Sequence, residues 1–188
     1  MLGACRTLKL VVEARRRFEA LYLAHAGAVR TYVRRRSDVE ATEDVVADVF
    51  VVAWRRLDDI PDDPLPWLLG VARRVLANQR RGASRDAALR DRIMSDLDRA
   101  PSAELILPES GKAVLRALSV LREQDREALL LVAWEGLEPG QAARVMGVRA
   151  NTFAARLSRA RRRFARALAA DRDRSDQELG PVKAEVVR

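Results

Sequence analysis

Apolar side chains recur three and four positions apart along most of this chain, which is the spacing of one face of an α-helix. The pattern is clearest where five residues share one helical face: Val46, Val49, Phe50, Ala53 and Leu57. The run Val49–Val52 could instead be a buried strand, but the helical period continues on both sides of it. We therefore expect an all-α fold, with two small helical domains joined by a linker and a helix-turn-helix in the second domain.

Changes in this pattern divide the 188 residues into five parts. Residues 13–82 and 112–170 have strong helical periodicity, and each is long enough for a small domain. Residues 83–111 are charged and contain two prolines, so we expect a linker there. Residues 1–12 are expected to form a flexible N-terminal extension. Residues 171–188, which have little apolar content, are expected to form a disordered tail.

Glycine, proline and capping residues place the helix ends of the first domain. Gly27 predicts a break, and Gly82 predicts the end of a helix. Ser37 and Glu40 have the spacing of a capping box that opens a helix. The segment Asp58–Pro66 contains four aspartates and three prolines, so it predicts a loop with Pro66 at the start of the next helix.

The composition narrows the class of protein. Lysine and arginine number 35 against 27 acids, for a net charge of +8 and a pI near 10.8. A strongly basic chain favours a polyanionic partner such as nucleic acid, and the alternative is a surface that is basic only for solubility. No apolar run approaches the ~20 residues that span a bilayer, and no secretory signal is clear. We therefore expect a cytoplasmic protein with no membrane insertion.

Cysteine and histidine are too few for several kinds of site. Because Cys5 and His25 are the single examples of each residue, the chain can form neither an internal disulfide nor a Cys/His zinc site. Nothing around His25 supports a Ser-His-Asp triad. We expect no metal and no cofactor.

The charges are unevenly distributed along the chain. Residues 139–170 contain eight arginines and no acid, whereas residues 38–63 contain nine acids and two arginines. Helices exposed to solvent normally mix opposite charges at i and i+4, which supports the helix. A long, purely positive stretch repels itself unless something external neutralises it. Phosphate is the best candidate for that partner.

Residues 140–161 carry the pattern of a helix-turn-helix. We expect a short helix at 141–146 and a long one at 151–168, with the small Ala142 and its neighbour allowing close helix approach. Gly147 permits the left-handed backbone that a tight turn after the first helix requires. The alternative is an ordinary pair of helices with a basic face in solvent.

The second helix of this motif has an apolar side and a polar side. Phe153 and Leu157, four positions apart, are expected to anchor it to the core. Its N-terminal part is placed to read base edges while basic neighbours contact phosphates. The candidate DNA-binding residues are Arg149, Asn151, Thr152, Arg156, Arg159 and Arg163.

Two separate blocks of this sequence resemble sigma factors of the sigma-70 family, in the extracytoplasmic-function (ECF) subgroup. The first block runs over 43–54 (EDVVADVFVVAW) and continues through Trp67–Arg74 and Asn78–Arg81. The second runs over 118–161 and includes the helix-turn-helix. The two blocks have the family's order, with a linker between them.

The resemblance implies a non-enzymatic protein that binds core RNA polymerase and directs it to promoters. In similar proteins the first domain contacts the clamp helices of the largest catalytic subunit and the -10 promoter element. The second domain reads the -35 element, and the flap of the second catalytic subunit is a further contact. Many members are held inactive by an anti-sigma factor.

The resemblance also assigns residues to the -10 element and to the melted strand. They are Asp62, Asp63, Trp67, Arg73, Arg74, Asn78, Arg80 and Arg81. Stacking on a base is one role for Trp67, and a place in the core is the alternative. The aspartates would repel phosphate, so contacts with base edges or helix capping suit them better.

The helix that Ser37 and Glu40 are expected to open carries an acidic, partly apolar stripe on one face, and the resemblance implies that this stripe contacts the polymerase. The stripe consists of four residues at spacings of four, three and four positions: Asp44, Asp48, Val51 and Arg55. Such a stripe suits an arginine-bearing helical partner, and it also suits a solvated helix face.

Three departures from the family leave the base preference open. Arg149 stands where a serine cap is frequent, Ala154 where a polar contact residue is frequent, and Gln141–Ala142 where an acidic–aliphatic pair is usual. Two other functions also stay open. One is a self-sufficient DNA-binding regulator, which gives the acidic segment 38–63 no role. The other is an adaptor whose basic helix meets an acidic protein.

Overall fold

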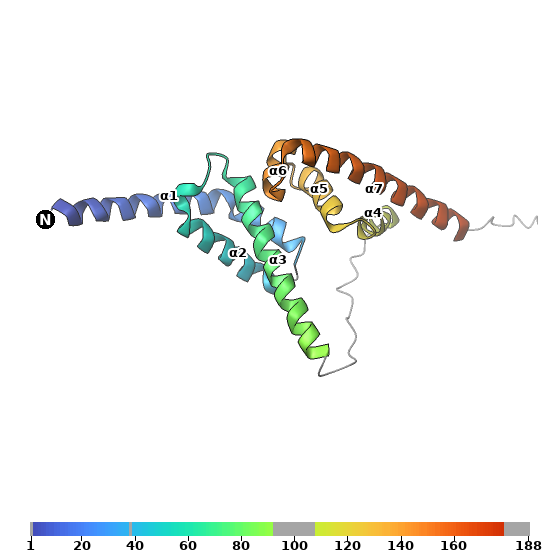
Figure 1. Ribbon diagram of the computed structural model, residues 1–188, viewed down its shortest axis with the longest axis horizontal. Coiled ribbons are helices and arrows are strands. Elements are labelled where there is room, and N and C mark those ends of the chain that lie inside the picture. The colour runs from blue at the N-terminus through green and yellow to red at the C-terminus, as the bar shows by residue number, and fades with distance from the viewer. Residues whose placement is uncertain (1, 38, 92–107, 179–188) are drawn as a thin grey trace, which may run out of the picture. The chain divides into compact units, whose positions relative to one another are not determined.

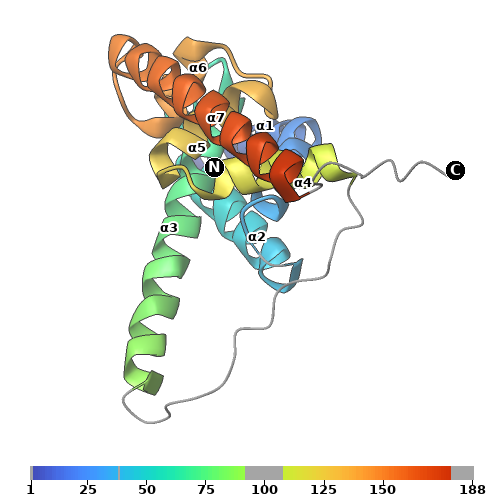
Figure 2. The same ribbon diagram turned by 90° about the vertical axis from the view of Figure 1, so that its right-hand side faces the viewer.

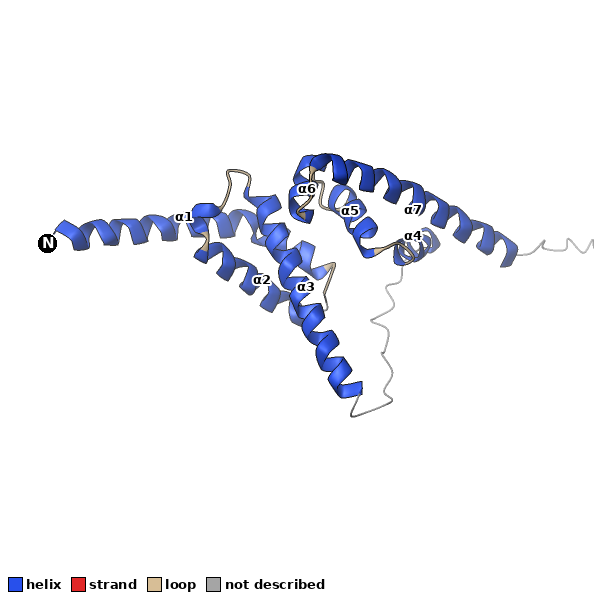
Figure 3. Cartoon of the chain, in the orientation of Figure 1, coloured by secondary structure: helices blue, strands red, loops and turns tan. Residues whose placement is uncertain are grey.

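The computed structural model describes residues 2–37, 39–91 and 108–178, with side chains over 11–37, 41–81 and 110–173 (Figure 1). Every regular element in these ranges is helical (Figure 3). The elements form two compact units. The first contains α1 (Leu2–Arg34), α2 (Val39–Arg55), the 3₁₀ turn η1 (Leu57–Asp59), α3 (Pro64–Asp91) and α6 (Pro139–Met146), and the second contains α4 (Glu109–Ser119), α5 (Glu123–Ala133) and α7 (Ala150–Glu178). The all-α fold class is confirmed.

In the first unit, α1, α2 and α3 pack against one another around one apolar core (Figure 2). Val29, Tyr32 and Val33 of α1 are fully buried, and Leu68 and Leu76 of α3 are at most 2% exposed. Four of the five residues predicted to share one helical face lie in α2 and are at most 4% exposed, which confirms the prediction for them. The fifth, Leu57, is also buried but lies in η1, beyond the end of α2. Burying each large apolar side chain stabilises the fold by roughly 1.5–3 kcal/mol.

The two breaks predicted from glycine are wrong. α1 continues through Gly27 to Arg34, and α3 continues through Gly82 to Asp91. A glycine inside a helix costs only about 1 kcal/mol relative to alanine. In α1 the buried Val29 and its neighbours on the next turn outweigh this cost.

The start of the chain and the start of α3 also differ from expectation. The extension predicted to be flexible belongs to α1 from Leu2 onward, because a helix propagates readily from a segment that is already packed. α3 begins at Pro64 rather than Pro66. Pro64 takes the first helical position, where its missing N–H is not needed. The first part of the predicted loop contains the short turn η1.

Ser37 closes α1 in the structure. Its hydroxyl donates to the carbonyl of Val33 at 3.1 Å, and its backbone N–H bonds the same oxygen at 3.0 Å. The hydroxyl also lies 3.5 Å from that of Thr42 in α2. The side chain of Glu40 lies outside the described residues, so the capping box stays a prediction.

In the second unit, α4 and α5 both pack against α7. Leu118, Leu121 and Leu130 form a buried cluster against which Phe164 packs. Arg126 fixes the turn between α4 and α5, because its guanidinium donates to the carbonyls of Leu118 (2.9 Å), Ser119 (3.0 Å) and Leu121 (3.1 Å). Leu118 and Ser119 lie in the last turn of α4, whose carbonyls lack the usual helical donor, and Leu121 lies in the turn that follows.

The tail prediction is wrong for residues 171–178, which continue α7 as helix. The reason lies in Asp171, whose side chain is 7% exposed and ion-paired with Arg116 of α4. Of the predicted linker, the first residues belong to α3 and the last to α4. Residues 92–107 and 179–188 lie outside the described residues.

Candidate nucleic-acid and polymerase interfaces

The turn between α6 and α7 has the backbone that the sequence predicts. Gly147 has φ +66°, a left-handed conformation that L side chains rarely adopt. Its N–H donates to the carbonyl of Arg144 at 3.1 Å, and the N–H of Val148 donates to that of Ala143 at 3.0 Å. These bonds end α6 as glycine-terminated helices usually end. Ala142 and Ala143 are buried, as expected for the first helix of the motif.

α7 begins at Ala150 and presents its first turn to solvent. The carbonyl of Arg149 accepts the N–H of Phe153 at 3.0 Å, so Arg149 takes the N-cap position. Its side chain has no oxygen to cap the helix. Phe153 is fully buried, whereas Asn151 and Thr152 are exposed. The buried anchor and the exposed polar residues are arranged as the sequence predicts.

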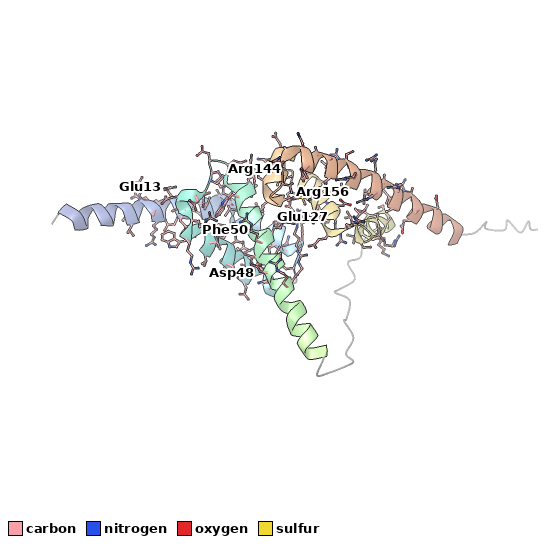
Figure 4. The ribbon with its side chains drawn as sticks, viewed as in Figure 1. Glu13, Asp48, Phe50, Glu127, Arg144 and Arg156 are labelled. Atoms are coloured by element: carbon pink, nitrogen blue, oxygen red, sulfur yellow. The ribbon has the colours of Figure 1, made fainter. Side chains whose placement is uncertain are left out.

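The arginines of α7 fall into two groups. Arg149 and Arg159 are exposed, and Arg156, which is labelled in Figure 4, is half-buried. None of the three forms an ion pair within the described part of the chain. Arg163 differs, because its guanidinium bonds the carboxylate of Asp125, whose side chain is 9% exposed. The sequence predicts that Arg163 points outward to DNA. In the structure its half-buried side chain ties α7 to α5.

The sequence prediction missed other arginines on this surface. Arg162 and Arg166 line an open groove of about 650 Å³ along α7 together with Arg159. Arg122, at the N-cap of α5, lines a neighbouring groove of about 460 Å³ with Arg156 and Arg159. The acid-free arginine run could have indicated the first two. Nothing in the linear sequence marks Arg122.

The residues assigned to the -10 element lie along α3 and the loop before it. Asn78, Arg74, Arg80 and Arg81 are exposed, whereas Arg73 is half-buried. Arg81 donates a hydrogen bond to the side-chain oxygen of Asn78. α3 therefore presents a mainly basic face.

Three residues at the start of this set have more mixed environments. Trp67 is half-buried, which suits both a core role and a stacking role. Asp62 is exposed, whereas Asp63 accepts hydrogen bonds from Arg144 (2.5 Å) and Gln141 (3.1 Å) of α6. The carboxylate of Asp63 is therefore bonded to a guanidinium group and to a side-chain amide.

The stripe predicted for the polymerase is exposed on α2. Its four residues all face solvent, and Val51 is 46% exposed. Asp48 is labelled on α2 in Figure 4, and neither Asp44 nor Asp48 forms an ion pair with a residue that the structure describes. Beside them, Glu43 accepts two hydrogen bonds from Arg30 of α1, at 2.8 and 3.1 Å. These bonds hold the pKa of Glu43 below its ordinary value.

The described part of the chain lacks two other kinds of site. It contains no cluster of three or more histidine, cysteine, aspartate or glutamate side chains that could hold a metal ion. None of its helices is both long and apolar enough to cross a membrane.

Two family profiles match this chain, and the second of them spans α6 of the first unit as well as α4, α5 and the start of α7 of the second. The sequence profile of Sigma-70 region 2 matches residues 21–86, and that of Sigma-70 region 4 matches residues 111–164. The RNA polymerase sigma factor NccH of Alcaligenes xylosoxydans xylosoxydans is 31% identical over 151 residues, covering 73% of this chain and 77% of the relative. The probable RNA polymerase sigma factor RfaY of Xanthomonas campestris is 33% identical over 132 residues, which are 66% of this chain but 33% of that protein.

The fold has a matching solved structure. The sigma factor RpoE of Bartonella quintana, crystallised in complex with the anti-sigma factor NepR, superimposes with a TM-score of 0.61 and 27% identity. The match covers 82% of this chain and 98% of that one. A helical fold that combines Sigma-70 region 2 with Sigma-70 region 4 defines a class of transcription initiation factors. This chain belongs to the sigma-70 family, whose members are non-enzymatic factors that bind core RNA polymerase and give it promoter specificity.

Proposed function

We propose that this chain is an ECF sigma factor that binds core RNA polymerase, recognises the -10 and -35 promoter elements and supports transcription initiation. Residues 13–82 act as the region 2-like domain and residues 112–170 as the region 4-like domain, with residues 83–111 joining them. The two profile matches fall within or close to these bounds. Because its polymerase and promoters are in the cytoplasm, we expect the chain to work there.

The first turn of α7 is the observation that carries the proposal. Asn151 and Thr152 are exposed directly after the left-handed turn at Gly147, and Phe153 fixes the helix from its other side. Recognition helices read base edges in the major groove from this N-terminal part. Arg149, Asn151 and Thr152 would read the -35 element. Arg and Asn can each form two hydrogen bonds with a base edge.

Phosphate contacts would supply most of the affinity. Arg156 and Arg159 follow the first turn, and the exposed Arg162 and Arg166 extend the basic surface along α7. Such contacts position a protein on DNA and make its binding fall steeply with salt. Arg163 is left out of this set because it is paired with Asp125.

The basic face of α3 suits the -10 element and the separated strand. Arg74, Asn78, Arg80 and Arg81 would follow the backbone, with Arg73 and Trp67 nearer the bases. Single strands are held by basic grooves together with stacking on aromatic side chains, at ~1–3 kcal/mol per stacked base. Asp62 and Asp63 would contact base edges, since carboxylates repel phosphate.

The stripe on α2 is the proposed polymerase contact. Asp44 and Asp48 leave negative charge available on an exposed helix face, and Val51 adds apolar area. This combination suits the clamp helices of the largest catalytic subunit, and the flap of the second would contact the region 4-like domain. An anti-sigma factor is a further partner to expect, because RpoE of Bartonella quintana was crystallised with one.

Run-off transcription with purified core enzyme tests the proposal. The chain should direct core to defined start sites on genomic fragments, and core alone should not. Failure of core to retain the chain, with no inhibitor present, would overturn it. Tight duplex binding by the isolated chain, as a dimer on paired half-sites, would favour a self-sufficient regulator instead.

A further inference from the structure

An arginine of α1 holds the turn η1, with which the loop proposed to read the -10 element begins. The guanidinium of Arg17 donates to the carboxylate of Asp58 at 3.0 Å and to the backbone carbonyl of Leu57 at 3.4 Å. These two partners follow Arg17 by 41 and 40 positions in the sequence. Arg17 therefore links the first helix of the chain to the first two residues of η1.

The part of α1 that carries Arg17 is itself packed against α2. The ring of the next residue, Phe18, meets that of Trp54 edge-on at 5.2 Å between centroids, and that of Phe50 at 6.2 Å. Aromatic pairs of this kind have preferred orientations and stabilise the contact beyond the area that they bury. Arg17 therefore reaches η1 from a stretch of α1 that is held beside the end of α2.

The contacts inside η1 close the turn but do not orient it. Arg56 donates from its side chain to the carboxylate of Asp59 at 2.9 Å, and its carbonyl accepts the backbone N–H of Asp59 at 3.0 Å. Both bonds join residues only three positions apart. The chain then leaves η1 at Ile60 with extended backbone. The orientation of η1 is set by the buried side chain of Leu57 and by Arg17.

We propose that Arg17 is a positioning residue for recognition of the -10 element. It holds η1, so that the loop after η1 presents Asp62 and Asp63 to the bases in one orientation, and it contacts no base itself. This inference rests on the proposed function, which assigns the two aspartates to base edges. Residues that recognise a ligand need neighbours that hold them close to the productive geometry. A loop held in place before binding also loses less conformational freedom when it binds.

The exposure of the ion pair limits the size of the expected effect. The side chain of Arg17 is 53% exposed and that of Asp58 is 93% exposed. Ion pairs in such positions are screened by water and salt, and they contribute little to the stability of a fold. We therefore expect loss of the pair to weaken binding of the -10 element about threefold and to leave the melting temperature unchanged.

Binding of the separated strand by the holoenzyme tests the inference. The probe is a single-stranded oligonucleotide with the -10 element of a promoter found by run-off transcription, compared with the same strand carrying single-base changes. Arg17→Ala should weaken binding of the matched strand about threefold and reduce discrimination against the changed bases. Its affinity for core RNA polymerase should equal that of the wild type. Arg17→Lys keeps a cation beside Asp58 and should recover part of the loss.

Arg16→Ala is the matched control. Arg16 is exposed at the neighbouring position of α1 and forms no ion pair in the part of the chain that the structure describes. The substitution removes the same charge without changing a contact to η1. It should leave both the affinity for the strand and the base discrimination unchanged.

Salt dependence and a double variant separate positioning from direct contact with DNA. Loss of a phosphate contact on a single strand lowers the slope of log affinity against log salt by about 0.7, whereas loss of a positioning residue leaves it unchanged. Asp58→Ala should weaken binding as Arg17→Ala does, and the double variant should lose no more than the weaker-binding single variant. As independent charges the two substitutions would have opposite effects, because removing an acid favours a polyanion.

Three outcomes overturn the inference while the proposed function stands. Arg17→Ala could match Arg16→Ala in affinity for the strand and in base discrimination. Its salt slope could fall by about 0.7, which would make Arg17 a phosphate contact. Asp58→Ala could bind the strand more tightly than the wild type. A wild-type holoenzyme that binds the strand no better than core alone would overturn the proposed function and the inference together.

Discussion

Arg116 of α4 and Asp171 of α7 form a bidentate ion pair, with Nε 2.9 Å from Oδ1 and Nη2 2.9 Å from Oδ2. The Asp171 side chain is 7% exposed, whereas that of Arg116 is 48% exposed. Arg116→Met removes the cation and leaves a buried carboxylate, so it should destabilise the second unit by about 1–3 kcal/mol. Urea unfolding measures this loss in a Trp54→Phe/Trp67→Phe background, where Trp134 alone reports on the second unit.

Arg172 supplies the control for this pair. It is exposed on α7 next to Asp171, so Arg172→Met should change stability by no more than about 0.5 kcal/mol. Combining Arg116→Met with Asp171→Leu removes both charges and should recover most of the loss. Equal stabilities for Arg116→Met and Arg172→Met would show that the pair contributes nothing.

The same substitution should have opposite effects at two glycines. Gly147 has φ +66° and open space where an added methyl group would lie, so Gly147→Ala adds backbone strain alone and should destabilise by about 1–2 kcal/mol. Gly27 lies inside α1, also with no atom within 4 Å of an added Cβ. Gly27→Ala should stabilise by about 0.5–1 kcal/mol, because alanine is the better helix former. Thermal unfolding of both variants provides the comparison.

Replacing Gly147 with asparagine shows whether backbone strain or side-chain size causes the loss of stability at the turn. Asn tolerates the left-handed region better than other L residues, so Gly147→Asn should lose less stability than Gly147→Ala. The reverse order would mean that the turn responds to bulk rather than to backbone conformation.

Periodicity and turn chemistry predicted the parts of this fold that depend on local sequence. The buried face of α2 follows from its 3.6-residue period, and the left-handed backbone at Gly147 follows from glycine's lack of a Cβ. The same local reasoning was wrong at Gly27, where a cost of about 1 kcal/mol is small beside the burial of Val29 and Tyr32 on the next turn. Tertiary packing decides such positions.

The candidate site shows the same limit. The arginine-rich segment without Asp or Glu predicted a basic helix. It did not indicate which of its arginines would form an ion pair with an acidic residue elsewhere in the chain. Arg163 pairs with Asp125, and Arg116 with Asp171, across 38 and 55 positions of sequence. Both pairs depend on the packing of α7 against its neighbours, which charge patterns do not reveal. The second pair also explains why the tail prediction failed at Asp171.

The pair between Arg30 and Glu43 predicts a pH-dependent contribution to stability. Hydrogen bonding to Arg30 lowers the pKa of Glu43 in the folded state below its unfolded value. In the window between these two values the unfolded chain binds more protons, so this contribution is present above the ordinary Glu pKa of ~4.3 and is lost as the pH falls through the folded pKa. Glu43→Gln should therefore melt below the wild type at pH 7, and the difference should shrink towards pH 3. A difference that is constant across this range would contradict the assignment.

Two measurements should distinguish the arginines of α7 that contact DNA from the arginine that stabilises the fold. They are the salt dependence of promoter binding and the melting temperature. Arg156→Ala with Arg159→Ala should leave the melting temperature nearly unchanged and weaken promoter binding by the holoenzyme. If both residues contact phosphate, the slope of log affinity against log salt should fall by about two, one for each lost contact. Arg163→Ala should instead lower the melting temperature, because it leaves the carboxylate of Asp125, 9% exposed, without its cation. A double variant that keeps the wild-type salt slope would remove both arginines from the DNA surface, and the basic face of α7 would then require a different partner.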